Sequence, residues 1–242
     1  MKKLFYVLIT GILLAHHAKE YIEVESYSTS FKGGKIFHFH YDYYVEDSEH
    51  PIFDHWELTP GMSYGITNYL MFDIHTHFAK FGRGFIVDQS VEELSPFIEA
   101  LAMALQLRLK RFMPLDIAFV FAYEIPFERS KRYLGGKEVY EGKMILSRDF
   151  GEHSNITMNF VFAKDGEEFI KEWAFGIKTP FSSDLHGIAG GIEILGDYEG
   201  ALFFLPGLFI PIEENVIFKA GIGAGNSKST SLRANVTFMY SF

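Results

Sequence analysis

Histidine and acidic residues recur at every second position in three short stretches of the chain. The set consists of His38, His40, Asp42, His55, Glu57, Asp73, His75 and His77. Alternate residues of a β-strand point to the same side of the sheet, so each stretch would present its imidazoles and carboxylates together. Side chains of these types can hold a transition metal, transfer protons in catalysis, or line a hydrated passage.

Three of these histidines, His40, His75 and His77, are the candidate metal ligands, because neutral imidazole binds transition metals well. We favour the alternative that the whole set forms a hydrated polar wall whose members hydrogen-bond to one another, since the interiors of membrane barrels are generally polar. No cofactor is expected. No serine motif accompanies the histidines, so we expect a protein that is not an enzyme, with a lipid- or peptide-cleaving barrel as an alternative.

The elements that would position this set are strands, because apolar and polar residues alternate along most of the chain. The alternating segments span residues 35–46, 54–66, 69–80, 97–110, 115–126, 139–150, 154–164, 168–179, 185–196, 200–211, 215–224 and 230–242. In the first segment, Phe37, Phe39 and Tyr41 fall on the face opposite His38 and His40. That division is typical of a strand between lipid and water. We therefore predict an all-β fold, a transmembrane antiparallel up-and-down β-barrel of about 12 strands.

Charged residues from the other segments fall on the inward face of this barrel. They are Arg108, Lys110, Asp116, Glu124, Glu172, Glu193, Lys219 and Arg233. Segment 200–211 is different, because it is apolar on both faces and Pro206 interrupts its hydrogen-bond ladder. Its inward residues Phe203, Leu205 and Phe209 would give the lumen an apolar patch compatible with a hydrophobic solute.

The expected width of the barrel does not by itself decide whether the barrel conducts. Conduction depends on whether a segment of the chain occupies the lumen. A barrel of this size is wider than the filled eight-stranded kind and narrower than open porins. Two parts of the chain could fold inward: the N-terminal segment, residues 19–34, which lies either in the periplasm or in the lumen, and the connection 81–92. Short connections such as 67–68 alternate with longer ones such as 127–138, which predicts that the short ones face the periplasm.

The two ends of the chain indicate export and assembly. Residues 1–18 have a basic start, an apolar run too short to span a bilayer, and small residues near the end, as a secretory signal peptide does. Apolar residues at alternate positions lead to the terminal aromatic, which resembles the closing strand of bacterial outer-membrane barrels. Tyr240 and Phe242 are the predicted assembly signal. We therefore expect the chain after residue 18 to be exported across the inner membrane and to meet the barrel-assembly machinery through its last strand. Residues 35–242 would form the barrel in outer-membrane lipid.

Composition agrees with a single exported domain of this class. Aromatic residues make up 17% of the chain, which suits lipid-facing surfaces, and cysteine is absent, so disulfide and thiol chemistry are excluded. The formal net charge is −9, and an acidic chain without a basic cluster argues against a nucleic-acid partner.

The sequence also resembles a known family. The run His55-Trp56-Glu57-Leu58-Thr59-Pro60, the stretch 64–68 and the stretch 105–126 are similar to the outer-membrane family of the MetA pathway of phenol degradation. One departure is Phe127-Glu128-Arg129-Ser130, where that family usually has a small polar turn with glycine. The resemblance implies a twelve-stranded barrel that acts as a channel for small molecules, hydrophobic ones included, and it carries no catalytic set. We therefore expect an outer-membrane channel for passive passage of a small solute, with a barrel enzyme or a metal-handling or structural barrel as alternatives.

Overall fold

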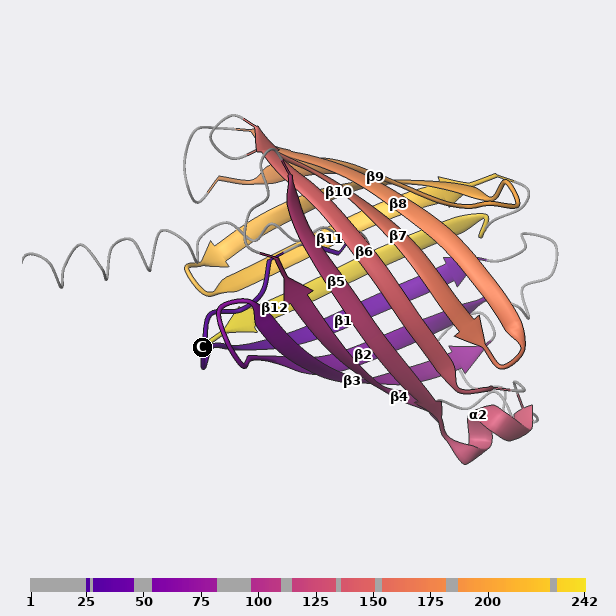
Figure 1. Cartoon of the computed structure of the whole chain (residues 1–242). Coiled ribbons are helices and arrows are strands. Elements are labelled where there is room, and N and C mark those ends of the chain that lie inside the picture. The colour runs from indigo at the N-terminus through magenta and orange to yellow at the C-terminus, as the bar shows by residue number, and fades with distance from the viewer. Residues whose placement is uncertain are drawn as a thin grey trace, which may run out of the picture.

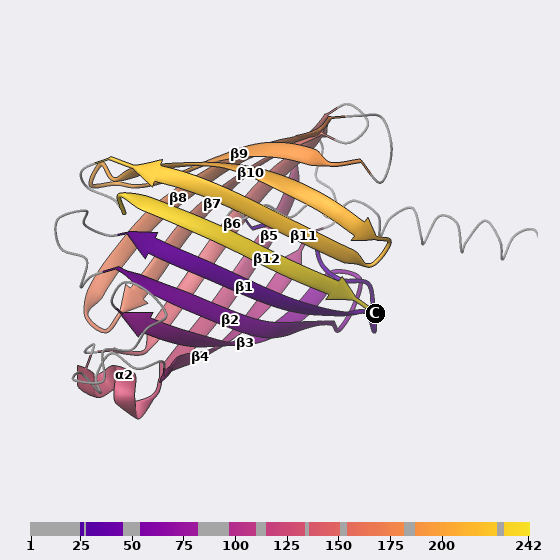
Figure 2. The same ribbon diagram turned by 180° about the vertical axis from the view of Figure 1, so that it is seen from behind.

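The computed structural model describes residues 25–26, 28–45, 54–81, 97–109, 115–133, 136–150, 154–181, 187–226 and 230–242. Within these residues the chain forms a closed barrel of antiparallel strands, shown from two sides in Figures 1 and 2. The strands are β1 (Lys35–Val45), β2 (His55–Gly65), β3 (Leu70–Phe81), β4 (Phe97–Arg108), β5 (Asp116–Pro126), β6 (Val139–Phe150), β7 (Ser154–Asp165), β8 (Glu168–Pro180), β9 (Ala189–Asp197), β10 (Leu202–Glu213), β11 (Val216–Gly225) and β12 (Leu232–Ser241). The predicted all-β barrel and its number of strands are confirmed.

The barrel closes at a continuous seam between its first and last strands. β1 and β12 pair from Ile36 with Ser241 to Val45 with Leu232 without a register shift. Beyond the first of these pairs, the backbones of residues 35 and 242 donate hydrogen bonds of 2.9 Å to each other in both directions. We call this end of the barrel the terminal rim and the opposite end the loop rim; Figure 1 marks the C-terminus at the terminal rim. Closure of this kind removes the exposed edges that an open sheet would have.

The side chains divide into an apolar outer face and a polar inner face. Large apolar residues that stay exposed include Phe37, Met62, Leu105, Phe121, Phe162 and Leu208. Buried residues of the opposite parity include His38, Asp42, Gln106, Thr157, Lys219 and Asn235. A soluble protein shows the reverse arrangement, whereas a wall between lipid and water requires this one. The predicted assignment of faces is confirmed for these strands.

Several bounds and connections differ from those expected. β9 begins at Ala189 rather than at residue 185, and the pairing of β3 with β4 shifts register between His77 and Phe78. At the loop rim, β7 and β8 are joined only by residues 166–167, with Gly166 at a φ of 58°. This connection is short, as the predicted segments 154–164 and 168–179 imply, so the connections at the loop rim are not uniformly longer than those at the terminal rim. Helix α2 (Glu128–Tyr133) lies in the connection between β5 and β6.

The apolar strand β10 has the interruption that its proline predicts. Its pairing with β9 is continuous through Pro206, whereas its pairing with β11 omits Leu205 and Pro206. Proline has no N–H to donate, which accounts for a gap on one side only. Phe203, Leu205 and Phe209 are buried in a cluster with Ala174, so the predicted apolar patch inside the barrel is present.

Part of the segment that precedes β1 lies inside the barrel. Residues 25, 26 and 28 line a cavity in the lumen. The predicted signal peptide, residues 1–18, and the connection 82–96 lie outside the described residues. No helix in the described part of the chain is long and apolar enough to cross a membrane.

Candidate functional site

The described residues line two adjoining cavities in the lumen. The larger, about 580 Å³, is lined by residues of β1–β6, β11 and β12, and the smaller, about 340 Å³, by residues of β6–β10 and β12. Glu141, Lys143 and Arg233 line both. The cavities therefore meet at these three side chains, and together they extend along most of the inner wall.

One carboxylate organises the histidines of β1 and β3. The Asp73 carboxylate lies 3.0 Å from His38 Nε2 and 2.6 Å from His75 Nδ1. It also accepts a hydrogen bond of 2.5 Å from the Ser63 hydroxyl. The network continues from His38 Nδ1 to His40 Nε2 at 3.0 Å. Sequence analysis predicted that these residues share a face, and the structure shows that they also bond to one another.

Gly61 makes room for this network between β1 and β3. The strand register places Gly61 opposite both His38 and His75. A Cβ at this position would lie 2.5 Å from the His38 ring and 2.6 Å from the Cβ of His75. Glycine is therefore required here by the close approach of two imidazole side chains across β2.

The predicted metal ligands do not converge on one point. His40 has both ring nitrogens in hydrogen bonds, one to His38 and the other, at 2.9 Å, to the Thr237 hydroxyl. His77 Nδ1 lies 3.4 Å from the Thr59 hydroxyl. Within the described residues, no group of three or more His, Cys, Asp or Glu side chains could hold a metal ion. These contacts are those of the interpretation that we favoured from the sequence, a polar wall whose members hydrogen-bond to one another.

Three residues of this network have the types found in the catalytic triad of a hydrolase, but their side chains are arranged differently. They are Ser63, Asp73 and His75. In a Ser–His–Asp triad the imidazole lies between the hydroxyl and the carboxylate. Here the Asp73 carboxylate lies between Ser63 and His75. The serine hydroxyl therefore bonds to a carboxylate, and this arrangement does not prepare it as a nucleophile.

A second cluster joins β1 to β12 across the seam. Arg233 contacts one oxygen of the buried Asp42 through Nε at 3.0 Å and Nη2 at 2.9 Å, and Asn235 donates to the same oxygen at 2.5 Å. The guanidinium of Arg233 also lies 4.6 Å from the centre of the Tyr44 ring, which stacks on His55 at 4.4 Å. The charge of Asp42 is thereby balanced within the wall.

The other predicted residues lie as follows. Glu57, Glu124 and Lys219 line the larger cavity and Glu172 lines the smaller one, while Asp116 and Glu193 are buried. Glu57 lies 3.4 Å from His55, and Glu124 lies 3.8 Å from His77. Arg108 lies at the terminal rim over the Tyr69 ring, Tyr240 and Phe242 stack at the same rim, and Lys110 is outside the described residues. Arg108 therefore lies closer to the terminal rim than the histidine network does.

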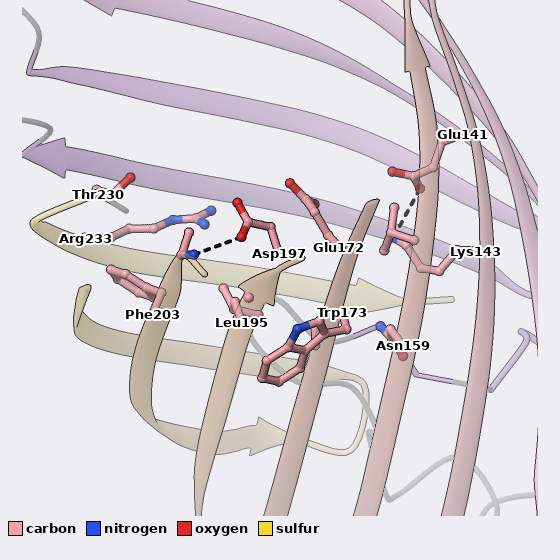
Figure 3. Close-up of a pocket in the computed structure, with 14 residues that line it drawn as sticks. Glu141, Lys143, Asn159, Glu172, Trp173, Leu195, Asp197, Phe203, Thr230 and Arg233 are labelled. Atoms are coloured by element: carbon pink, nitrogen blue, oxygen red, sulfur yellow. Dashed lines mark hydrogen bonds and ion pairs between the residues drawn. The ribbon is translucent and has the colours of Figure 1, made fainter. Parts of the chain in front are cut away.

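Sequence reasoning missed Lys143, which lines both cavities. Its inward position on β6, between Glu141 and Ile145, was the available signal. Its ammonium lies 3.2 Å from Glu141 and contacts the carboxylate of Glu25. Figure 3 shows Glu141 and Lys143 on one side of the smaller cavity, with Glu172, Asp197, Arg233, Leu195 and Phe203 also lining it.

Several solved structures share the fold of this barrel. No protein-family model matches the chain, and no curated protein sequence matches it significantly. The KdgM porin in complex with disordered oligogalacturonate matches with a TM-score of 0.61 at 10% identity, over 86% of this chain and 99% of that one. An outer-membrane channel from Pseudomonas putida F1 matches with a TM-score of 0.57 at 12% identity, over 90% and 98% of the two chains. The NanC porin matches with a TM-score of 0.54 at 8% identity, over 86% and 98%.

At such low identity the likeness concerns the fold alone. The chain therefore has the fold of the outer-membrane β-barrel porins and channels. The narrower resemblance to the MetA-pathway family stays a prediction from the sequence.

Proposed function

We propose that this protein is a channel of the bacterial outer membrane through which a small solute diffuses passively. The observation that carries the proposal is the pair of adjoining cavities inside a closed barrel whose outer face is apolar. The porins and the channel that share the fold support it as well. In such a passage, its width and the charges that line it decide which solutes pass.

The lumen offers two unlike walls to a solute. The strand order places β8–β10 half a turn round the ring from β2–β4. On that side Phe203, Leu205 and Phe209 form an apolar cluster, and the Lys178 ammonium lies 5.0 Å from the centre of the Phe209 ring. Of this cluster, Phe203 lines the smaller cavity together with Leu195, so a small molecule with polar groups and an apolar surface would contact apolar side chains there and polar ones on the opposite wall. Hydrophobic molecules are therefore among the solutes that we propose.

Conductance across a planar lipid bilayer tests the proposal. Carboxylates outnumber fixed cations in the two cavities: Glu25, Asp42, Glu57, Asp73, Glu124, Glu141, Glu172 and Asp197 against Lys143, Lys219 and Arg233. We expect discrete conductance steps and a preference for cations in a salt gradient. Glu172→Gln, in the smaller cavity, should weaken that preference, and Arg108→Gln, at the terminal rim, should strengthen it.

The control for these variants is Glu214→Gln, because Glu214 is exposed in the turn between β10 and β11. It should leave the reversal potential unchanged. A protein that shows β-sheet circular dichroism and inserts into lipid, yet gives no steps above the leak, would contradict the channel proposal. Equal reversal potentials in all variants would show that the altered charges do not lie along the conducting path.

We also propose that the terminal aromatic is read by the barrel-assembly machinery. Phe242 is 55% exposed beyond the end of β12, where its ring stacks on Tyr240 and lies 5.5 Å from the Lys35 ammonium. Because the side chain lies outside the lumen wall, Phe242→Ala should reduce the amount of assembled barrel in the outer membrane and leave the conductance of the assembled fraction unchanged. Quantifying folded barrel in membrane fractions checks this. An unchanged yield would remove the assembly role.

A further inference from the structure

The root of the segment that precedes β1 is fixed to β2 at the terminal rim. Of the N-terminal segment, residues 19–34, the structure describes residues 25, 26 and 28–34. Gly33 N donates to Gly65 O at 2.8 Å, and Gly65 N donates to Gly34 O at 2.9 Å. A Cβ on Gly65 would overlap the carbonyl oxygen of Phe31. The segment therefore lies directly against the backbone of β2.

The middle of the N-terminal segment bonds to the turn between β2 and β3. The Thr29 hydroxyl donates to the backbone oxygen of Asn68 at 3.1 Å, and Lys32 N donates to its side-chain oxygen at 2.9 Å. Ser30 N lies 3.4 Å from the sulfur of Met71, a residue that lines the larger cavity. These contacts direct the segment from the rim into the lumen.

Three side chains of the barrel wall recognise the inner end of the segment. Gln106 Nε2 donates to Ser26 O at 2.7 Å. In the amide orientation that satisfies its hydrogen bonds, Asn159 accepts from Glu25 N at 2.6 Å and donates to Glu25 O at 3.2 Å. The Lys143 ammonium binds the carboxylate of Glu25. Gln106 and Asn159 are almost fully buried, and buried amides need such partners.

We propose that Gln106, Lys143 and Asn159 form a binding site for the chain's own N-terminal segment, and that the bound segment obstructs the solute path. The site takes an extended peptide that carries a carboxylate, because two wall residues bond to backbone groups and the third is a cation. Glu25 binds at Lys143, the side chain at which the two cavities meet. The second part of the proposal, obstruction, rests on the proposed channel function; the first part, binding of the segment, does not.

The ion pair between Glu25 and Lys143 can be removed without altering the wall. When Glu25 is replaced by glutamine, the Lys143 ammonium keeps Glu141 at 3.2 Å. The barrel itself therefore retains a partner for this buried cation. Hydrogen bonds between charged groups are strong enough that losing one should raise the released population of the segment roughly tenfold.

A single introduced thiol reports whether the segment is bound. The chain has no cysteine, so Ser26→Cys supplies a unique site, and Ser26 is only 5% exposed. A water-soluble thiol reagent should label the Ser26→Cys barrel slowly, and it should label the Ser26→Cys, Glu25→Gln barrel about tenfold faster. The matched control is Ser26→Cys with Glu141→Gln, which removes the same charge beside the same ammonium but from the wall. Its labelling should stay slow.

Gly65→Ala provides a second route, because it displaces the root of the segment and leaves Lys143 unchanged. It should also speed labelling at residue 26, whereas Gly142→Ala, whose added Cβ has only one neighbouring atom, at 4.0 Å, should not. β-sheet circular dichroism confirms that each variant is folded. Equal labelling rates in all folded variants would overturn the binding site.

Conductance then tests the obstruction separately. Glu25→Gln should raise the open probability or the step size of the channel, and Glu214→Gln, exposed in the turn between β10 and β11, should leave both unchanged. Faster labelling with unchanged conductance would overturn the obstructing role. Faster labelling of Glu25→Gln in a protein that conducts in no variant would overturn the proposed channel function while supporting the binding site.

Discussion

Replacing Phe160 by arginine should lower the free energy of unfolding in lipid by about 2–4 kcal/mol, the cost of a charge at mid-membrane on the outer face of a barrel. Phe160 lies near the middle of β7, with the same parity as the exposed Phe162. Its neighbour Val161 points the other way and lines the smaller cavity. An arginine at residue 161 can extend into the cavity and reach water, so Val161→Arg should cost much less.

Equilibrium unfolding by urea in lipid vesicles measures both variants. The two substitutions introduce the same side chain one residue apart, so differences in strand propensity and in distance from the rims largely cancel. Equal losses, or a larger loss for Val161→Arg, would contradict the assignment of the outer face. In detergent micelles the difference should shrink, because the deformable micelle allows the charge to reach water.

The strands and their faces could be predicted because they depend on a local pattern. In β1, every residue from Phe37 to Asp42 has the predicted side, since a shift of one residue would move His38 and Asp42 into lipid and Phe37 into the lumen. The pattern extends over enough strands that small errors in their bounds, such as the late start of β9, leave the fold unchanged. The apolar patch of β10 was predictable for the same reason.

The bonding partners inside the lumen could not be predicted, because they depend on register between strands. Asp42 and Arg233 are 191 residues apart and meet only through the pairing of β1 with β12. The way Asp73 joins His38 to His75 depends in turn on the absence of a side chain at Gly61. An alternating pattern shows which side of the wall a residue occupies and does not show which residue lies opposite.

The sequence could not predict which segment of the chain enters the lumen, because this too depends on residues that only the folded barrel brings together. The sequence offered residues 19–34 and the connection 81–92 as candidates, and both are polar enough to enter a hydrated lumen. The entry of the N-terminal segment into the lumen depends on three wall residues from different strands, Gln106, Lys143 and Asn159, that contact two consecutive residues of the segment. Only the assembled barrel brings these three side chains together.

Replacing Asp42 by leucine should lower the free energy of unfolding by about 3 kcal/mol, because removing one partner of a buried ion pair leaves the other charge uncompensated. Asp42 is 6% exposed and accepts hydrogen bonds from both Arg233 and Asn235 on β12. This loss in the free energy of unfolding should lie near the low end of the range for broken buried ion pairs, because Arg233 borders both cavities and water can reach it there.

The matched control for this loss is the double variant Asp42→Leu, Arg233→Leu, which removes both charges. Replacing both members of a buried pair by apolar residues is often close to neutral, so the double variant should recover much of the stability lost in Asp42→Leu. Urea unfolding of the wild type, the two single variants and the double variant gives the coupling energy of the pair across the seam. Losses that add without coupling would mean that Asp42 stabilises the barrel through Asn235 alone, and that the seam is held by its backbone ladder rather than by this ion pair.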